Sequence, residues 1–110
     1  MNRTLSLMML ACIQTSLLAA KPTDITFVNP DQWTTTVTVE KSPAVVVIIQ
    51  PQDKATIRNV ADETIAISAT GTSNGKMITV SRRFTGYNNG KKTWTIHPQA
   101  YDRTINITKS

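Results

Sequence analysis

From Asp24 onward, apolar and polar residues alternate in short runs, and turn residues separate these runs about every ten positions. Alternation with a period of two is typical of strands that are buried on one face, and the many threonines and valines also favour strands. No stretch carries a sustained 3.6-residue apolar period, so we expect no substantial helix in this part of the chain. The pattern predicts eight strands, over residues 25–28, 34–40, 45–49, 54–60, 64–70, 77–84, 93–97 and 103–108.

The strand predicted at residues 45–49 is apolar at every position, with the sequence Val-Val-Val-Ile-Ile. A strand without alternation is typical of one that is covered on both faces. We therefore expect this strand to lie in the centre of a sheet or to cross between two sheets.

Two Asn-Gly pairs predict turns, and the length of each loop decides which side chains share a face. A two-residue turn at residues 74–75 brings apolar positions together, since it pairs Ala69 with Val80 and Ile65 with Phe84.

A three-residue loop over residues 88–90 pairs Phe84 with Trp94 and Arg82 with Ile96. This second hairpin would also bring His97 near Ser81. Both hairpins assume that consecutive strands are neighbours in one sheet.

Eight strands within residues 21–110 fit a single all-β domain, a small two-sheet antiparallel β-sandwich of immunoglobulin-like type. We expect no disulfide in it, because no cysteine follows Cys12. The packing of its core must therefore stabilise this domain without a covalent cross-link.

The first twenty residues carry one positive charge, Arg3, no acidic residue and an apolar stretch that begins at Leu5. This layout predicts a helical signal peptide over residues 1–20, cleaved after Ala19 or Ala20, and hence a secreted or periplasmic protein. The apolar stretch is too short and too broken for a stable membrane span, so no transmembrane span is expected after cleavage.

A minor alternative concerns Cys12, which lies inside this segment. The preceding residues 9–11, Met-Leu-Ala, loosely resemble the lipobox at which bacterial lipoproteins are cut and acylated. Lipidation at Cys12 would anchor the protein to a membrane instead of releasing it.

Composition argues against catalysis. The chain has one histidine, His97, and lacks a paired-carboxylate motif, a Gly-x-Ser-x-Gly sequence and a phosphate-binding glycine loop. The acidic pair at residues 62–63 is isolated, and His97 has no second histidine at ligand spacing. We predict that the protein is not an enzyme and holds neither a metal nor another cofactor.

The formal net charge is +5, which suits an acidic protein surface or a polyanionic glycan as partner and equally suits solubility. Positive charge concentrates in the second predicted hairpin, where cations, amides and an aromatic ring together can hold an acidic sugar or an acidic protein surface. Trp33, at a loop-to-strand junction, is a candidate surface anchor. The candidate binding residues are Arg82, Arg83, Tyr87, Asn88, Asn89, Lys91, Lys92 and Trp33.

Arg82 and the lysine pair at residues 91–92 also have a structural interpretation. Arg82 shares a face with Val80 and Phe84 and can reach past the edge of the core to solvent, and a lysine pair can protect an edge strand from aggregation.

Residues 106–108, Asn-Ile-Thr, match an N-glycosylation acceptor, and whether Asn106 is modified stays open.

These observations predict an exported, non-catalytic binding domain that recognises an acidic or glycan partner through the basic hairpin. Two alternatives stay open. A small secreted inhibitor or effector can present a loop or an edge strand to a protein target, and a subunit of a surface assembly can have its sheet completed by its partner. We expect no nucleic-acid partner, and the pattern does not determine the oligomeric state.

Overall fold

The computed structural model describes residues 22–85 and 90–110, and this part of the chain is all-β. Its strands are β1 (Thr23–Asn29), β2 (Thr34–Glu40), β3 (Val45–Ile49), β4 (Asp53–Val60), β5 (Thr64–Ser73), β6 (Lys76–Phe84), β7 (Thr93–Gln99) and β8 (Thr104–Lys109). The prediction of eight strands is confirmed, and β2 and β3 begin and end at the predicted residues. The predicted signal peptide, residues 1–20, lies outside the described residues. Within the described ranges, no helix is long and apolar enough to cross a membrane.

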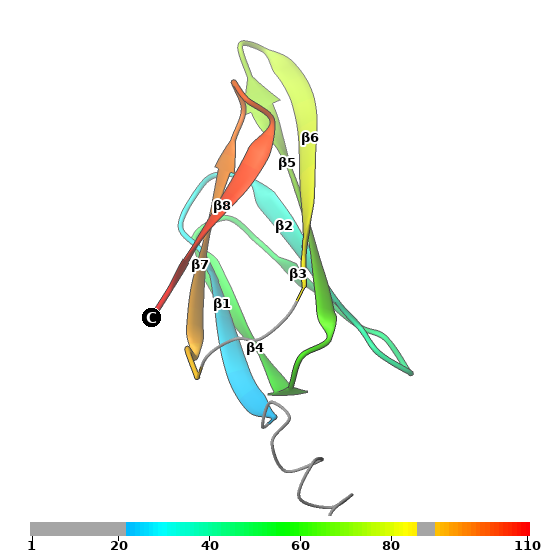
Figure 1. Ribbon diagram of the computed structural model, residues 1–110. Coiled ribbons are helices and arrows are strands. Elements are labelled where there is room, and N and C mark those ends of the chain that lie inside the picture. Colours follow the sequence, from blue (N-terminus) through cyan, green and yellow to red (C-terminus); the bar gives the residue numbers. More distant parts are fainter. Residues whose placement is uncertain (1–21, 86–89) are drawn as a thin grey trace, which may run out of the picture.

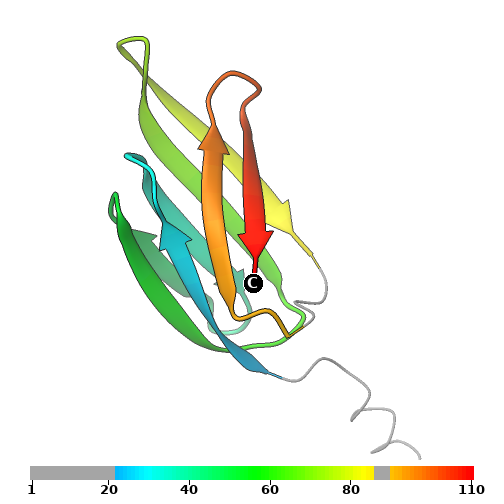
Figure 2. The same cartoon turned by 90° about the vertical axis from the view of Figure 1, so that its left-hand side faces the viewer.

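The strands form two sheets that face each other. Sheet A has the order β4-β1-β7-β8 and sheet B the order β3-β2-β5-β6. Figure 1 looks into the side of the molecule where β6 and β8 lie, and Figure 2 shows sheet A in front of sheet B. The two-layer arrangement therefore agrees with the strand count, but the pairing is not purely antiparallel, because β1 and β7 run parallel.

The alternation in the sequence accounts for the core. Successive side chains of a strand point to opposite faces, and in β1, β2, β5 and β7 every second residue is buried. The buried apolar residues of all eight strands pack between the sheets in one cluster, which consists of Ile25, Phe27, Val37, Val39, Ile49, Ile57, Val60, Ile65, Ile67, Ala69, Val80, Trp94, Ile96 and Ile105. Each fully buried isoleucine or valine stabilises the fold by about 1.5–3 kcal/mol relative to its exposed state.

The first predicted hairpin is confirmed. β5 and β6 pair with Ala69 opposite Val80 and with Ile65 opposite Phe84. The turn between them has positive φ at Asn74 (52°) and Gly75 (77°), the left-handed backbone that a two-residue hairpin turn requires. Local turn chemistry thus determines this register.

The second predicted hairpin is wrong. β6 belongs to sheet B and β7 to sheet A, so the two strands are not paired. Phe84 and Trp94 do meet, but across the core, with ring centroids 6.3 Å apart in a T-shaped arrangement. Two strands in facing sheets can bring these two apolar residues together, and so can a hairpin. The apolar pattern alone therefore does not distinguish the two arrangements.

The expected proximity of His97 and Ser81 fails with that hairpin. Ser81 follows the buried Val80 on β6 and therefore points to the outer face of sheet B. His97 follows the buried Ile96 on β7 and points to the outer face of sheet A, where it lies opposite Asn106. The two side chains thus lie on opposite sides of the molecule.

The expectation for residues 45–49 is also wrong. β3 is an edge strand that pairs with β2, and the chain crosses to sheet A only after it, at residues 50–52. Its inward side chains pack on the core, whereas Val46 and Ile48 point to the outer face and are 58% and 63% exposed. A continuous apolar run therefore marks here a strand that exposes apolar surface.

Candidate functional site

Four strands form the edges of the two sheets, and β3 differs from the other three. β4 carries Asp53, Lys54 and Arg58, β6 carries Lys76, Arg82 and Arg83, and β8 carries Lys109. β3 has no charged residue. Charged side chains on an edge strand prevent pairing with another chain, so among the described edges only β3 lacks this protection.

The backbone of β3 is ready to accept a further strand. On one side its ladder to β2 runs without a register shift from Thr35 opposite Ile49 to Val39 opposite Val45. On its other side no described strand pairs with it, so the backbone N–H and C=O groups that point to this side belong to no strand ladder, although the carbonyl of Ile49 accepts a hydrogen bond from Asn29. An extended peptide can bind such an edge through main-chain hydrogen bonds.

Asn29 holds the end of β3 in place. Its side chain is fully buried, and its Nδ2 lies 3.2 Å from the carbonyl oxygens of Ile49 and Gln50 and 2.5 Å from that of Trp33. One amide therefore ties the end of β1 to the β1–β2 loop and to the end of β3. The sequence offered no signal for this role, because an asparagine before a proline reads as a turn residue.

A second contact holds the start of the β3 region. The turn before β3 contains Lys41, whose Nζ donates a hydrogen bond to the carbonyl oxygen of Asn59 on β4, with the two atoms 3.2 Å apart. Hydrogen bonds thus connect the turn before β3 and the end of β3 to other parts of the protein.

The outer face beside β3 carries hydroxyl groups. Val46 and Ile48 lie opposite Thr38 and Thr36 of β2, and these threonines line a shallow depression of about 500 Å³ together with Ala66, Ile67, Ser68, Ser81, Arg82 and Arg83. A partner strand at β3 would therefore meet two exposed apolar side chains at the border of a polar face.

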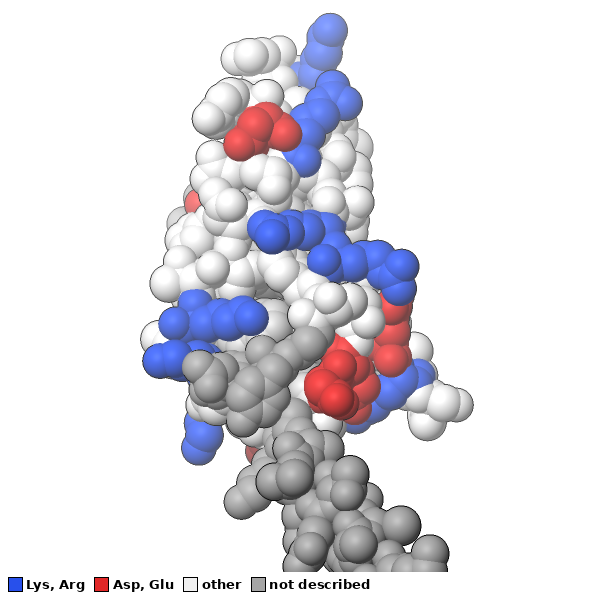
Figure 3. Space-filling view, in the orientation of Figure 1, with Lys and Arg blue, Asp and Glu red and all other residues white. Residues whose placement is uncertain are grey.

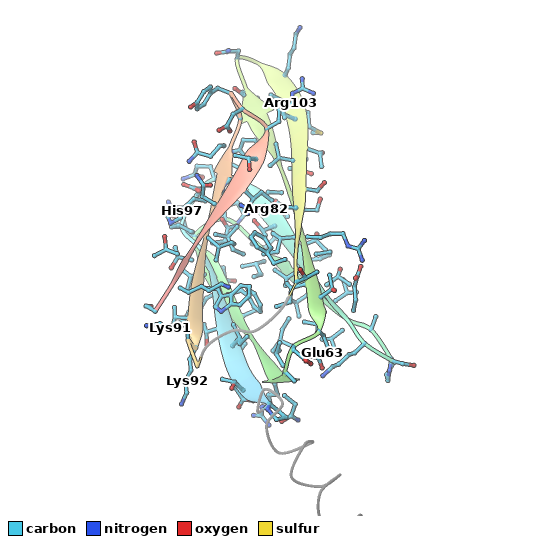
Figure 4. The ribbon with its side chains drawn as sticks, viewed as in Figure 1. Glu63, Arg82, Lys91, Lys92, His97 and Arg103 are labelled. Carbon is cyan, nitrogen blue, oxygen red and sulfur yellow. The ribbon has the colours of Figure 1, made fainter. Side chains whose placement is uncertain are left out.

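Of the residues proposed from the sequence, Arg82 has a structural role. It projects from β6 into the opening between the sheets, where its Nη1 donates a hydrogen bond to the carbonyl oxygen of Ile105 on β8 at 2.9 Å. Its guanidinium carbon also lies 4.6 Å from the centroid of the Phe84 ring. Arg82 thereby joins the edges of the two sheets (Figure 4).

An aromatic row lies beside Arg82. Trp94 is buried between Phe27 and Phe84, at 5.5 Å and 6.3 Å between ring centroids. The Nζ of Lys109 lies 4.1 Å from the Trp94 ring centroid. Because both cations rest on aromatic rings, this side of the sandwich is covered by cation–π contacts.

Arg83 is already paired. It points to the outer face of sheet B and reaches across β5 to Glu40, with 2.5 Å between the guanidinium nitrogen and the carboxylate oxygen. This ion pair is exposed, and it lowers the positive charge that Arg83 presents to an acidic ligand.

The structure does not bring the basic candidates together in one hairpin. Lys91 and Lys92 are exposed just before β7, away from Arg82, which lies further along the molecule in Figure 4. Figure 3 shows the cations of this side in separate groups, with acidic residues beside several of them. Tyr87, Asn88 and Asn89 lie outside the described residues.

Trp33 lies against the core. Its half-buried ring covers Gly71 of β5 so closely that a Cβ at Gly71 would come within 2.6 Å of it. Only glycine allows this approach, so Trp33 and Gly71 form one packing unit.

The acidic and metal-binding residue types stay dispersed. Within residues 22–85 and 90–110, no group of three or more His, Cys, Asp and Glu side chains lies close enough to hold a metal ion. The candidate functional site is the edge of β3, because β3 is the described edge strand that carries no charged residue. Strand charges in the sequence do not indicate it, because β5 and β7 also lack charged residues and only the strand order shows that β3 is an edge.

Comparison of the chain with protein-family models, with curated proteins and with solved structures gave no match.

Proposed function

We propose that this protein is an exported, non-catalytic binding module and that its partner adds a β-strand at the free edge of β3. The observation that supports this most is the contrast among the four edges: β3 alone among those described carries no charge, and it exposes Val46 and Ile48. Soluble proteins normally protect such an edge, so one that is left uncharged is suited to recognition.

Strand addition also fits the chemistry of β3. Main-chain hydrogen bonds provide affinity without a particular side-chain sequence, and alternate side chains of the added strand provide specificity. On the outer face, Val46 and Ile48 select a partner strand with apolar residues at the facing positions. This function combines two of the alternatives drawn from the sequence, an edge strand offered to a protein target and a sheet completed by a partner.

The immunoglobulin-like type is the finer description of the fold that we propose. Sheet B, read as β6-β5-β2-β3, follows the G-F-C-C′ order of variable-type immunoglobulin domains, and the β4–β1 pair corresponds to strands E and B. β7 takes the place of strand A but runs parallel to β1. In this description β3 corresponds to C′.

An acidic or glycan partner is the second candidate. The exposure of Lys91 and Lys92 favours it, while the contacts of Arg82 and Arg83 inside the protein weigh against the complete basic set. Such binding would weaken steeply with salt, whereas strand addition through apolar contacts would not.

A peptide with the sequence of β2, residues 34–40, tests the strand-addition proposal, because its alternating Val37 and Val39 can face Val46 and Ile48 while its main chain completes the ladder. We expect the peptide to shift the backbone amide resonances of β3 in an NMR titration and to leave those of β6 unchanged. The same peptide with N-methyl groups on alternate residues should not bind, since it cannot complete the ladder.

Two matched variants locate the binding. Ile48→Lys places a charge on the outer face of β3, and Met77→Lys makes a similar exchange on β6, where Met77 is 79% exposed. Peptide binding should be lost in the first variant and kept in the second. Absence of shifts at millimolar peptide, or equal shifts on β3 and β6, would overturn the proposal.

A further inference from the structure

We infer that the strand added at β3 comes from a second copy of this chain, so that two molecules pair β3 to β3 in an antiparallel manner. This inference rests on the proposed function of the β3 edge and names its partner. The two β3 strands would join two four-stranded sheets into one continuous eight-stranded sheet.

The sequence of β3 complements itself. A two-fold axis through Val47 places Val47 opposite Val47, Val46 opposite Ile48 and Val45 opposite Ile49. Val46 and Ile48, which share the outer face, then cover each other's exposed side chains. Every cross-strand pair consists of two β-branched residues, a favourable combination in antiparallel sheets.

Charge permits this pairing at β3 and opposes it at the other edges. Charged side chains on an edge strand lose hydration when a second strand pairs with it, and β4, β6 and β8 all carry lysine or arginine. β3 brings no charge into the contact.

The flanking residues also favour two-fold symmetry. Lys41 precedes β3 in the turn after β2. An antiparallel pair places the two Lys41 residues at opposite ends of the ladder, whereas a parallel pair would set Lys41 near Lys41, and like charges repel.

One ladder of five residues is a small contact. Because it lies at the low end of specific interfaces, we expect a reversible dimer with a Kd of about 10 µM to 1 mM. Apolar contacts and main-chain hydrogen bonds dominate this contact, so sodium chloride should weaken the dimer little and ammonium sulfate should strengthen it.

Sedimentation equilibrium over this concentration range measures the dimer directly. We expect Ile48→Lys to raise the Kd by roughly tenfold or more, because the ammonium group would face Val46 of the second copy. Met77→Lys, the matched exchange on β6, should leave the Kd unchanged. Dimerisation that Ile48→Lys does not weaken would show that the copies meet elsewhere and would overturn the inference.

Cysteine cross-linking tests the register. In a Cys12→Ser background, a mixture of Val46→Cys and Ile48→Cys proteins should form mixed disulfides, because these positions face each other at about 4.5–5.5 Å between Cβ atoms. Each variant alone should cross-link poorly, since its own copies meet only diagonally at about 7–8 Å. Disulfides that form mainly between identical variants would overturn the proposed register.

These experiments test separately whether the partner is a second copy and whether β3 binds an added strand at all. If the protein stays monomeric up to millimolar concentration but the β2 peptide binds at β3, the second-copy inference is wrong and strand addition stands. If neither the second copy nor the peptide binds β3, both are wrong.

Discussion

The two edges of sheet B are constructed in opposite ways. β6 carries three cations, one of which, Arg82, bonds to a carbonyl group of β8 and rests on Phe84. β3 carries none and leaves Val46 and Ile48 exposed. One side of the sandwich is thus closed and protected against pairing, whereas the other is open to it. An edge strand can therefore be stable without being protected.

Different side chains stabilise the two sides. On the β3 side the contact is the fully buried amide of Asn29, and on the β6 side it is the exposed guanidinium of Arg82 above an aromatic row. Because hydrogen bonds contribute more when solvent is excluded, the two contacts should differ in their contribution to stability.

The largest effect is expected from removing the centre of the aromatic row. Trp94→Ala should lower the free energy of unfolding by about 3–5 kcal/mol, because it empties the space between Phe27 and Phe84. Urea denaturation followed by circular dichroism measures this loss. Tyr101→Ala, at a side chain that is 90% exposed, should change stability by less than about 0.5 kcal/mol. Equal effects of the two substitutions would show that the aromatic row on the β6 side does not stabilise the fold.

Asn29→Ala should come next, with a loss of about 2–3 kcal/mol, because buried carbonyl groups lose their donor. Asn29→Asp keeps the shape of the side chain but its carboxylate cannot donate, so it should destabilise at least as much in the same denaturation experiment. A harmless Asn29→Asp would mean that Asn29 acts by filling space and not by donating hydrogen bonds.

Arg82→Ala and Arg83→Ala compare two neighbouring cations on the β6 edge. Arg82→Ala should cost about 1–2 kcal/mol, since it removes a charge-assisted hydrogen bond and a cation–π contact. Arg83→Ala should cost less than about 0.5 kcal/mol, because its ion pair with Glu40 is exposed and screened. We expect the difference in unfolding midpoint between Arg83→Ala and the wild-type protein to disappear when salt is raised from 0.05 M to 0.5 M. The difference for Arg82→Ala should remain.

The smallest effect on folding is expected at the open edge itself. Ile48→Lys should change the free energy of unfolding by less than about 0.5 kcal/mol when measured at concentrations where the protein is monomeric, because the side chain is 63% exposed. A loss above about 2 kcal/mol would show that β3 needs this side chain for its own fold, and the peptide experiment would then require Ile48→Thr in its place.

Part of this fold follows from the sequence, and particular residues show why the remainder does not. The Asn74-Gly75 turn determined the β5–β6 register because only a left-handed two-residue turn brings the neighbouring apolar positions together. The pairing of β6 with β7 failed because a longer connection leaves the chain free to cross to the other sheet, where Phe84 meets Trp94 equally well.

The sequence predicted the candidate site less well than it predicted the fold. The basic residues attracted attention as charges, but the partners that occupy Arg82 and Arg83 come from strands distant in sequence, Ile105 and Glu40. The apolar run at residues 45–49 was read as a buried strand, because a pattern of side chains contains no information on what covers them.

By itself the sequence determined the strands, the inward faces of the strands that alternate and the absence of long helices in the described domain, since periodicity and turn propensity act between residues close along the chain. Only the tertiary structure decided the order of strands in each sheet, the parallel β1–β7 pair and the position of β3 at an edge. These features depend on which distant segments bury the most surface against one another, and that free energy belongs to the assembled core and not to any single segment.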